Sequence, residues 1–239
     1  MHEFKKLSIV VPVFNEERTL RKLIDAIEAV DLPLKKEIIL VDDGSRDKSR
    51  EILEEYKDRH KVIFLDKNSG KGSAVRRGFE EATGDIVLIQ DADLEYDPQE
   101  YPDLIKPIID SGADIVYGSR FIKSEKTRNN SIVYKHGYFA SQALNQLSNV
   151  LSGIWLSDMY ACYKVFPKKI LNEISPHLKS KRFGIDLELT AWIGKMNLKV
   201  VEVPISYKGR TYNEGKKINW KDGLAAVWHL IRFNVFTRK

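Results

Sequence analysis

The feature that most constrains the fold is a short apolar run that ends in acidic residues. Residues 86–89 are all branched aliphatic, and Asp91 and Asp93 follow after a single glutamine. A run this short is typical of a strand buried on both faces of a parallel sheet. In open α/β sheets the carboxyl ends of the strands form the edge where ligands bind. The run therefore predicts an α/β fold with two carboxylates at its ligand-binding edge.

Strands and amphipathic helices alternate around this run. Further strands are expected at residues 7–13, 37–41, 62–65 and 114–118, and the segments between them carry apolar side chains at helical spacing. The alternation of strand and helix up to residue 89 predicts a parallel, right-handed, doubly wound sheet.

The second half of the chain contains longer helical stretches. A polar loop is expected at residues 123–130, a helix at 131–151, and a helix at 185–196 between strands at 160–166 and 198–207. The residues that we expect to form the buried face of the helix at 131–151 are Phe139, Ala143, Leu147, Val150 and Leu151.

The stretch from Trp220 to Lys239 is amphipathic. Its apolar stripe at helical spacing consists of Trp220, Leu224, Val227, Trp228, Ile231 and Val235. We expect this stripe to pack on the core of its own domain, which is the commoner use of such a face. The additional aromatic residues Phe233 and Phe236 and the basic end also suit a helix that lies in a membrane interface.

Composition narrows the class of protein. With 239 residues, 43% apolar and 31% charged, the chain has the composition of a soluble globular protein with one large domain or two small ones. No apolar run approaches the length of a membrane span. The only cysteine, Cys162, excludes an intramolecular disulfide and favours a reducing compartment. The net charge of +5 permits an anionic substrate or a membrane surface.

Asp91 and Asp93 predict a metal site. Because they are two residues apart on an extended chain, their carboxylates can point to the same side. Carboxylate oxygens are the preferred ligands of hard divalent cations such as Mg²⁺ and Mn²⁺. An acidic turn after a strand would contain the same residues, so this alternative stays open.

Motifs at the predicted strand ends resemble those of family 2 glycosyltransferases with the GT-A fold. They are Ile9-Val10-Val11-Pro12-Val13-Phe14-Asn15-Glu16, Val41-Asp42-Asp43-Gly44-Ser45-Arg46-Asp47, Gly70-Lys71-Gly72 and Asp91-Ala92-Asp93. Later segments resemble the dolichyl- and polyprenyl-phosphate sugar synthases within that family. They are Gly118-Ser119-Arg120-Phe121, the stretch from Ser157 to Phe166, Asp186-Leu187-Glu188-Leu189-Thr190 and the stretch from Arg210 to Lys217.

This resemblance implies one domain over residues 1–239. The implied fold is α/β and Rossmann-like, namely a GT-A fold with a mixed, mostly parallel sheet flanked by helices and a C-terminal amphipathic helix. Residues 1–122 would bind the nucleotide sugar, residues 123–218 would bind the acceptor, and residues 219–239 would form the amphipathic helix.

The resemblance also implies roles for individual residues. The implied nucleotide-binding residues are Pro12, Phe14, Glu16, Asp43, Lys71 and Asp91. The implied ligands of Mg²⁺ or Mn²⁺ are Asp91, Asp93 and Glu95. The implied catalytic residues are Asp93, Asp158, Arg120 and Arg210. The implied ligands of an acceptor phosphate are Arg120, Arg210, Lys216 and Lys217, with Lys135 and Lys164 as weaker candidates. For Asp42 and Asp43 a structural role in a turn and a helix cap stays open.

The function implied is metal-dependent, inverting transfer of a mannose- or glucose-type hexose. The donor would be GDP-mannose or a UDP-hexose, and the acceptor would be polyprenyl or dolichyl phosphate. The expected location is peripheral, at the cytoplasmic face of a membrane, reached directly or through a membrane-embedded partner, and no nucleic-acid partner is expected. Two alternatives stay open: transfer to a saccharide hydroxyl with Asp158 as the base, and a nucleotide-sugar-binding protein without turnover.

Overall fold

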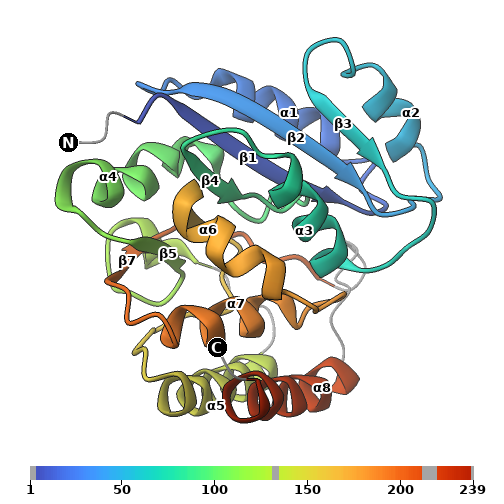
Figure 1. The fold of residues 1–239 in the computed structure, drawn as a ribbon. Helices are drawn as coiled ribbons and strands as arrows, with labels where there is room; N and C mark the ends of the chain where they lie inside the picture. The colour runs from blue at the N-terminus through green and yellow to red at the C-terminus, as the bar shows by residue number, and fades with distance from the viewer. Residues whose placement is uncertain (1–3, 131–134, 212–219, 238–239) are drawn as a thin grey trace.

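A single mixed sheet organises the molecule (Figure 1), and the computed structural model describes residues 4–130, 135–211 and 220–237. The sheet has seven strands in the order β3-β2-β1-β4-β6-β5-β7. Their bounds are Lys6–Val13 (β1), Lys35–Asp42 (β2), Lys61–Phe64 (β3), Ile86–Ile89 (β4), Ile115–Ser119 (β5), Lys164–Pro167 (β6) and Val200–Pro204 (β7).

Helices cover the sheet and extend beyond it. The α-helices are Leu20–Ala29 (α1), Ser49–Glu54 (α2), Lys71–Glu81 (α3), Tyr101–Ser111 (α4), Lys135–Ser152 (α5), Lys168–Ile174 (α6), Ile185–Gly194 (α7) and Trp220–Ile231 (α8). Short 3-10 turns lie at Pro98–Glu100, Lys126–Asn129 and Ser175–His177, and a π-helical turn at Arg232–Phe236 continues α8. None of the helices in the described part of the chain is both long and apolar enough to cross a bilayer.

The first half of the sheet is parallel, as the alternation of strands and helices predicts. β1 pairs in parallel with both β2 and β4, so that Ile9 lies beside Ile38 on one side and Leu88 on the other. The second half departs from this pattern because β6 runs antiparallel to both of its neighbours, β4 and β5. The sheet is therefore mixed and mostly parallel, which confirms the predicted fold class.

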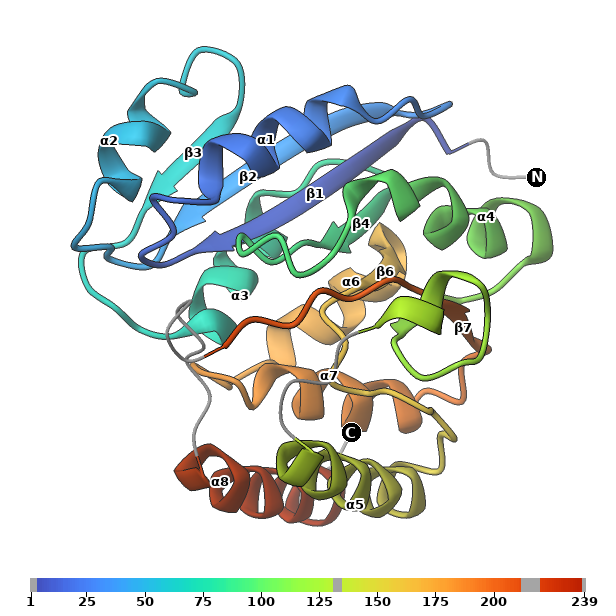
Figure 2. The same ribbon diagram turned by 180° about the vertical axis from the view of Figure 1, so that it is seen from behind.

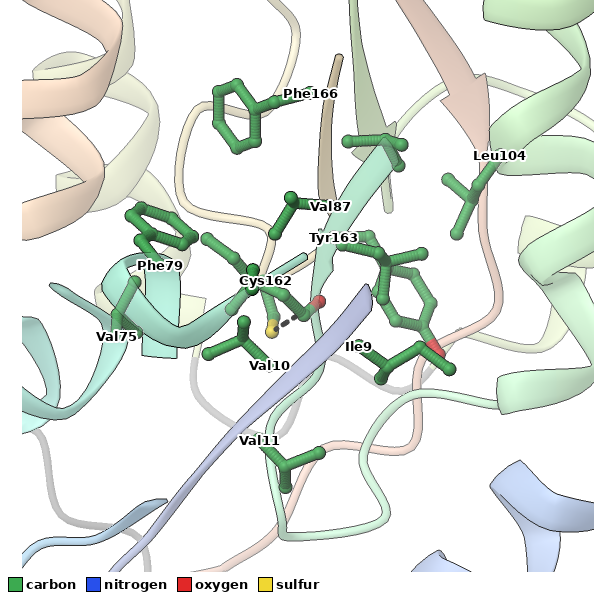
Figure 3. Packing of buried hydrophobic residues seen from close by; sticks show 14 of the residues in the cluster. Ile9, Val10, Val11, Val75, Phe79, Val87, Leu104, Cys162, Tyr163 and Phe166 are labelled. Atoms are coloured by element: carbon green, nitrogen blue, oxygen red, sulfur yellow. Dashed lines mark hydrogen bonds between the residues drawn. The ribbon is translucent and has the colours of Figure 1, made fainter. Parts of the chain in front are cut away.

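Figure 3 shows part of the hydrophobic core, including residues of β1, β4 and α3. Gly78 allows α3 to approach the sheet, because a Cβ at this position would lie 2.2 Å from a methyl carbon of Val10. The buried thiol of Cys162 donates a hydrogen bond to the carbonyl oxygen of Ile89, at 3.6 Å. This contact ties the segment before β6 to the end of β4.

Helices α5 and α8 lie side by side and form a layer separated from the sheet by α7 (Figures 1 and 2). Every residue of α7 from Ile185 to Ile193 is buried, as expected for a helix that is covered on all sides. The α5–α8 layer thus packs on a helix and not on the sheet.

The predicted buried face of α5 is wrong except at Leu151, which is half-buried and packs against the core. Phe139 and Val150 are 68% and 69% exposed, whereas Asn145 and Asn149 are only 2% exposed. The amides of both asparagines donate to the carbonyl oxygen of Leu156, at 2.6 and 2.9 Å. Their side-chain oxygens accept from the backbone N–H groups of Met159 and Leu156, at 2.8 and 3.1 Å respectively. The polar face turns inward because it satisfies the backbone of the loop after α5, which would otherwise be buried without partners.

The expectation that the apolar stripe of α8 packs on the core is also wrong. Leu224 and Trp228 are 65% and 56% exposed. The buried residues of this stretch are Ala226, Leu230 and Phe233, which face away from the stripe. The stretch that begins with α8 therefore packs through the small apolar face formed by Ala226, Leu230 and Phe233. From Leu224 on, the larger apolar stripe is exposed.

Candidate functional site

The loops that follow β1 and β2 are tied together at the carboxyl edge of the sheet. The N–H of Asn15 donates to the hydroxyl of Ser45 at 2.9 Å, and the N–H of Glu16 donates to that of Ser49 at 2.8 Å. Pro12 and Phe14 are half-buried at this edge, and the side chain of Glu16 is buried. The first predicted nucleotide-binding residues therefore occupy one fixed segment.

Asp43 joins the end of β2 to the start of α3. Its two carboxylate oxygens accept hydrogen bonds from the N–H groups of Ser69 and Gly70, both at 2.7 Å. Burial raises the pKa of Asp43, and these N–H donors act in the opposite direction. Gly70 has a φ of +95°, and a Cβ there would lie 2.4 Å from the carbonyl oxygen of Lys181, so glycine is required. This arrangement sets the position of the next residue, Lys71.

Lys71 and Asp91 form a half-buried ion pair across the edge. The Nζ atom of Lys71 lies 2.7 Å from Oδ1 and 2.8 Å from Oδ2 of Asp91. Burial opposes ionisation of both groups, but the charge of Lys71 lowers the pKa of Asp91, and Asp91 in turn raises the pKa of Lys71. The ammonium group of Lys71 is thus held beside the carboxylate of Asp91, just after the end of β4.

Asp93 lies in an excess of negative charge. Burial and the nearby charges of Asp91 and Glu95 raise the pKa of Asp93 from 3.8 to about 7, against the opposite effect of Arg210. Its Oδ1 accepts a hydrogen bond from the backbone N–H of Glu95 at 3.1 Å. The three acids therefore form one electrostatic unit, which we call the acidic cluster.

Arg210 bridges the acidic cluster to the loop after β1. Its guanidinium donates to Oε2 of Glu16 and Oδ2 of Asp93, both at 3.0 Å, and its Nε lies 3.7 Å from Oε1 of Glu95. The backbone N–H of Arg210 and the hydroxyl of Tyr207 also donate to the Glu95 carboxylate, at 2.8 and 3.0 Å. The strand predicted at 198–207 is shorter in the structure, where β7 ends at Pro204, and nothing in the sequence indicated that Tyr207 would reach this cluster.

The acidic cluster fits a divalent cation that arrives with phosphates. Within residues 4–130, 135–211 and 220–237 no three Asp, Glu, His or Cys side chains form a ready-made metal cage. Mg²⁺ normally takes one or two protein carboxylates and completes its shell with water and substrate phosphates. The raised pKa of Asp93 marks a place where added positive charge would stabilise the ionised carboxylate. The donor set therefore suits Mg²⁺ or Mn²⁺ bound together with a diphosphate.

Arg120 and Asp158 form a second charged pair after β5. The Nε and Nη2 atoms of Arg120 donate to the two oxygens of Asp158, at 2.7 and 2.8 Å, and Asp158 is only 2% exposed. Glu202, which the sequence did not indicate, accepts from the N–H groups of Ser157 and Asp158, at 2.9 and 3.2 Å. Because both oxygens of Asp158 are engaged by a guanidinium, this geometry favours a positioning role over that of a general base.

A basic cleft opens beside this pair. It has a volume of about 620 Å³. Its lining residues are Arg120, Phe121, Lys123, Ser124, Glu125, Thr127, Arg128 and Tyr138. The segment 123–130, expected to be a loop, contains a 3-10 turn and is fixed because Asn130 donates to the carbonyl oxygens of Arg120 and Ile205. Lys123 and Arg128 are thus cations of the cleft that the motifs did not single out.

The remaining predicted cations lie elsewhere. The side chain of Lys164 is fully buried, with Nζ 2.6 Å from both Oδ1 of Asp186 and the carbonyl oxygen of Ala161, so it does not line the cleft. Lys216 and Lys217 lie outside the described residues, and so does the side chain of Lys135.

Comparison with known proteins identifies relatives over most of the chain. A sequence profile described as glycosyl transferase family 2 matches residues 8–175. A dolichol-phosphate mannosyltransferase of Pyrococcus furiosus is 32% identical, with 88% of this chain and 59% of that protein aligned. An undecaprenyl-phosphate 4-deoxy-4-formamido-L-arabinose transferase of Photorhabdus laumondii is 31% identical, with 90% of this chain and 63% of that protein aligned. The chain thus spans about three fifths of the length of these two curated relatives.

Solved structures share the same architecture. The glucosyl-3-phosphoglycerate synthase of Mycobacterium tuberculosis, solved with Mn²⁺, uridine diphosphate and phosphoglyceric acid, superposes with a TM-score of 0.74. The superposition covers 98% of this chain and 80% of that chain, at 18% sequence identity. Similarity at this level of identity concerns the fold, and it confirms the GT-A architecture that the motifs imply.

Proposed function

The chain belongs to glycosyl transferase family 2, and from this premise we propose that it transfers a hexose from a nucleotide sugar to polyprenyl or dolichyl phosphate. The observation that carries the proposal is the contact of one side chain, Tyr207, with two sites of opposite charge. Its hydroxyl donates to Glu95 of the acidic cluster at 3.0 Å, and its ring centroid lies 4.9 Å from the guanidinium carbon of Arg120 in the basic cleft. This contact supports the proposal because it makes the proposed donor site and the proposed acceptor site neighbours.

The acidic cluster is the proposed donor site. Asp91, Asp93 and Glu95 would hold Mg²⁺ or Mn²⁺, which supplies positive charge to the diphosphate that leaves when the sugar bond breaks. Lys71 is fixed by Asp91 at the same edge, where it adds a second cation. Pro12 lies near the end of β1, and Phe14, Glu16 and Asp43 lie on the loops that follow β1 and β2. These four residues would contact the nucleoside.

Arg210 is the residue whose contacts must change when the donor binds. In the structure its guanidinium neutralises Glu16 and Asp93. A cation on Asp93 would replace that neutralisation and free the guanidinium for the phosphates, where arginine binds in a bidentate manner. We therefore propose that Arg210 compensates the cluster before donor binding and contacts anionic substrate groups afterwards.

The basic cleft is the proposed acceptor site. A phosphate monoester has a second pKa of about 6 and is mostly dianionic at neutral pH. Such an oxygen attacks the anomeric carbon without a general base, and attack opposite the leaving diphosphate inverts that carbon. Arg120, Lys123 and Arg128 would hold the phosphate, while Asp158 keeps Arg120 in place. The named relatives act on lipid phosphates, which supports this acceptor class.

The membrane is the proposed location of this reaction, because polyprenyl and dolichyl tails partition into bilayers. We propose peripheral attachment at the cytoplasmic face, where nucleotide sugars are available. Attachment would be direct or through a membrane-embedded partner.

Transfer assays with defined donors and acceptors test the proposal. Purified protein is incubated with Mn²⁺ or Mg²⁺, radiolabelled GDP-mannose, UDP-glucose or UDP-N-acetylglucosamine, and a short-chain, water-soluble polyprenyl phosphate. We expect label in the lipid phosphate with one donor, loss of product when the metal is chelated, and activity that survives Asp158→Asn in part. Product on a saccharide hydroxyl only, abolished by Asp158→Asn, would establish the alternative acceptor. Nucleotide binding without transfer to any acceptor would overturn the enzyme proposal.

A further inference from the structure

The outward faces of α5 and α8 concentrate the exposed apolar surface of the protein. Ten of the eleven large apolar residues that are exposed in the described part of the chain lie between residues 139 and 155 or between 224 and 236, and only Ile109 lies elsewhere. We call the surface formed by residues 139–155 and 224–236 the α5–α8 plate. Monomeric soluble proteins rarely expose apolar side chains in such a concentration, which marks an interaction surface.

The α5–α8 plate is almost free of charge. Residues 137–157 contain no Asp, Glu, Lys or Arg, and residues 223–237 contain only Arg232, although 31% of the whole chain is charged. A helix face that remains in water normally carries charged side chains, as α1 does with Arg21, Lys22 and Asp25. The plate therefore has the composition of a surface that is covered when the protein works.

The orientation of the plate is fixed by the fold. Asn145 and Asn149 hold the backbone of the loop after α5, and rotation of α5 to bury Phe139 and Val150 would break those hydrogen bonds. α8 is held by the buried Leu230 and Phe233 on its opposite face. The apolar side chains thus point away from α7 on both helices.

We propose that the α5–α8 plate lies on a lipid bilayer, with α5 and α8 in the plane of the membrane interface. Aromatic residues are favoured at that depth, and the plate exposes Phe139, Trp228 and Phe236. Its single charged residue, Arg232, is exposed and basic, so its guanidinium can reach anionic headgroups while its aliphatic part stays among the apolar side chains. A flat helix pair of this composition does not need to span the membrane to bind it.

The plate is continuous with the basic cleft, which favours a bilayer over other occupants. The ring of Tyr138, which lines the cleft, lies 5.2 Å from that of Phe121 in the cleft and 5.5 Å from that of Phe139 on the plate. This step rests on the proposed function: a phosphate in the cleft could keep its hydrocarbon tail in a bilayer that covers the plate. The exposed cations Lys123 and Arg128 at the same end suit anionic headgroups.

Vesicle co-sedimentation tests the proposal without donor or acceptor. The full chain is mixed with vesicles of phosphatidylcholine and phosphatidylglycerol, and the bound fraction is measured. The variant Ile231→Glu has a matched control in Ile109→Glu, because both isoleucines are 37% exposed but only Ile231 belongs to the plate. We expect the wild-type chain and Ile109→Glu to bind equally, Ile231→Glu to bind several-fold less, and the double variant Leu224→Glu, Trp228→Glu to bind about tenfold less or weaker still.

Two further measurements keep the outcome unambiguous. Transfer to the short-chain, water-soluble acceptor in the absence of vesicles should be unchanged in all three variants, which separates lost membrane binding from lost folding and from failure of the proposed enzyme activity. Light scattering gives the oligomeric state. A wild-type chain that binds no vesicles, or that binds them equally well with the double variant, overturns the proposal. A wild-type dimer that the plate variants dissociate, without vesicle binding, would assign the plate to a second copy of the chain instead.

Discussion

The edge of the sheet and the α5–α8 plate follow opposite rules of polarity. At the edge, acidic and basic side chains face one another: Lys71 faces Asp91, and Arg210 faces Glu16 and Asp93. On the plate, apolar side chains face outward and amides face inward. Polar groups have hydrogen-bonding partners in both regions. The α5–α8 plate differs because the amides that hold the loop after α5 are buried and its large apolar side chains are exposed. The proposed bilayer contact would account for the apolar side chains that the plate exposes.

The largest effect is expected from removing one charge of the acidic cluster. Asp93→Asn should lower the rate of transfer about a hundredfold to a thousandfold, because the cluster loses a ligand for the cation that stabilises the leaving diphosphate. The measurement is initial rate of sugar transfer with Mn²⁺ in excess. Asp103→Asn is a suitable control, since Asp103 is an exposed acid of α4 outside the cluster. Equal rates for the two variants would show that Asp93 of the acidic cluster is not needed for sugar transfer.

The sequence predicted the edge far better than the plate, for reasons that individual residues make clear. The four-residue strand Ile86–Ile89 is fully buried, as its apolar run indicates, and Asp91 and Asp93 follow it. α1 buries Leu20, Leu23, Ile24 and Ile27, which its periodicity predicted. Periodicity gives the spacing of a helical face, however, and not the direction in which it points.

Contacts between distant segments account for the rest. α5 is inverted because Asn145 and Asn149 bind a loop backbone whose position no local pattern reveals. Tyr207 and Glu202 were missed because their partners, Glu95 and Ser157, are distant in sequence. Such pairings depend on the tertiary fold, and only the charged motifs, which occur at strand ends, could be anticipated.

The next largest effect should come from the inward polar face of α5. Asn145→Leu should lower the free energy of unfolding by about 1–3 kcal/mol, because the carbonyl of Leu156 and the N–H of Met159 lose a buried partner. The neighbouring Gln146 is exposed, so Gln146→Leu should change it by only about 0.5 kcal/mol or less. Urea unfolding followed by circular dichroism compares them. If Asn145→Leu proved as stable as Gln146→Leu, the hydrogen bonds of Asn145 would not be what fixes the orientation of α5.

A smaller effect is expected in the pH dependence of stability. The pKa of Asp93 is raised from 3.8 to about 7, so the folded state holds a proton that the unfolded state has released. Its contribution to the free energy of unfolding is therefore fully present below about pH 4 and is lost as the pH rises to about 7. Asp93→Asn should lack this fall, so the wild-type curve should drop relative to the variant curve as the pH rises through this window. The stability of both proteins is measured by denaturant titration at several pH values without metal. Parallel curves of stability against pH would show that the cluster does not raise the pKa of Asp93.

The smallest effect is expected for an apolar residue on the plate, and a buried apolar residue of α1 serves as its control. Leu224→Gln on the plate should change the free energy of unfolding by about 0.5 kcal/mol or less, because Leu224 is 65% exposed and gives up little burial. Leu23→Gln in α1 should cost about 3 kcal/mol or more, because Leu23 is fully buried and the new amide has no partner there. Both values come from urea unfolding of the isolated chain. A large cost at Leu224 would mean that the protein itself covers the plate in solution, and then neither a bilayer nor any other outside surface would be needed to explain its composition.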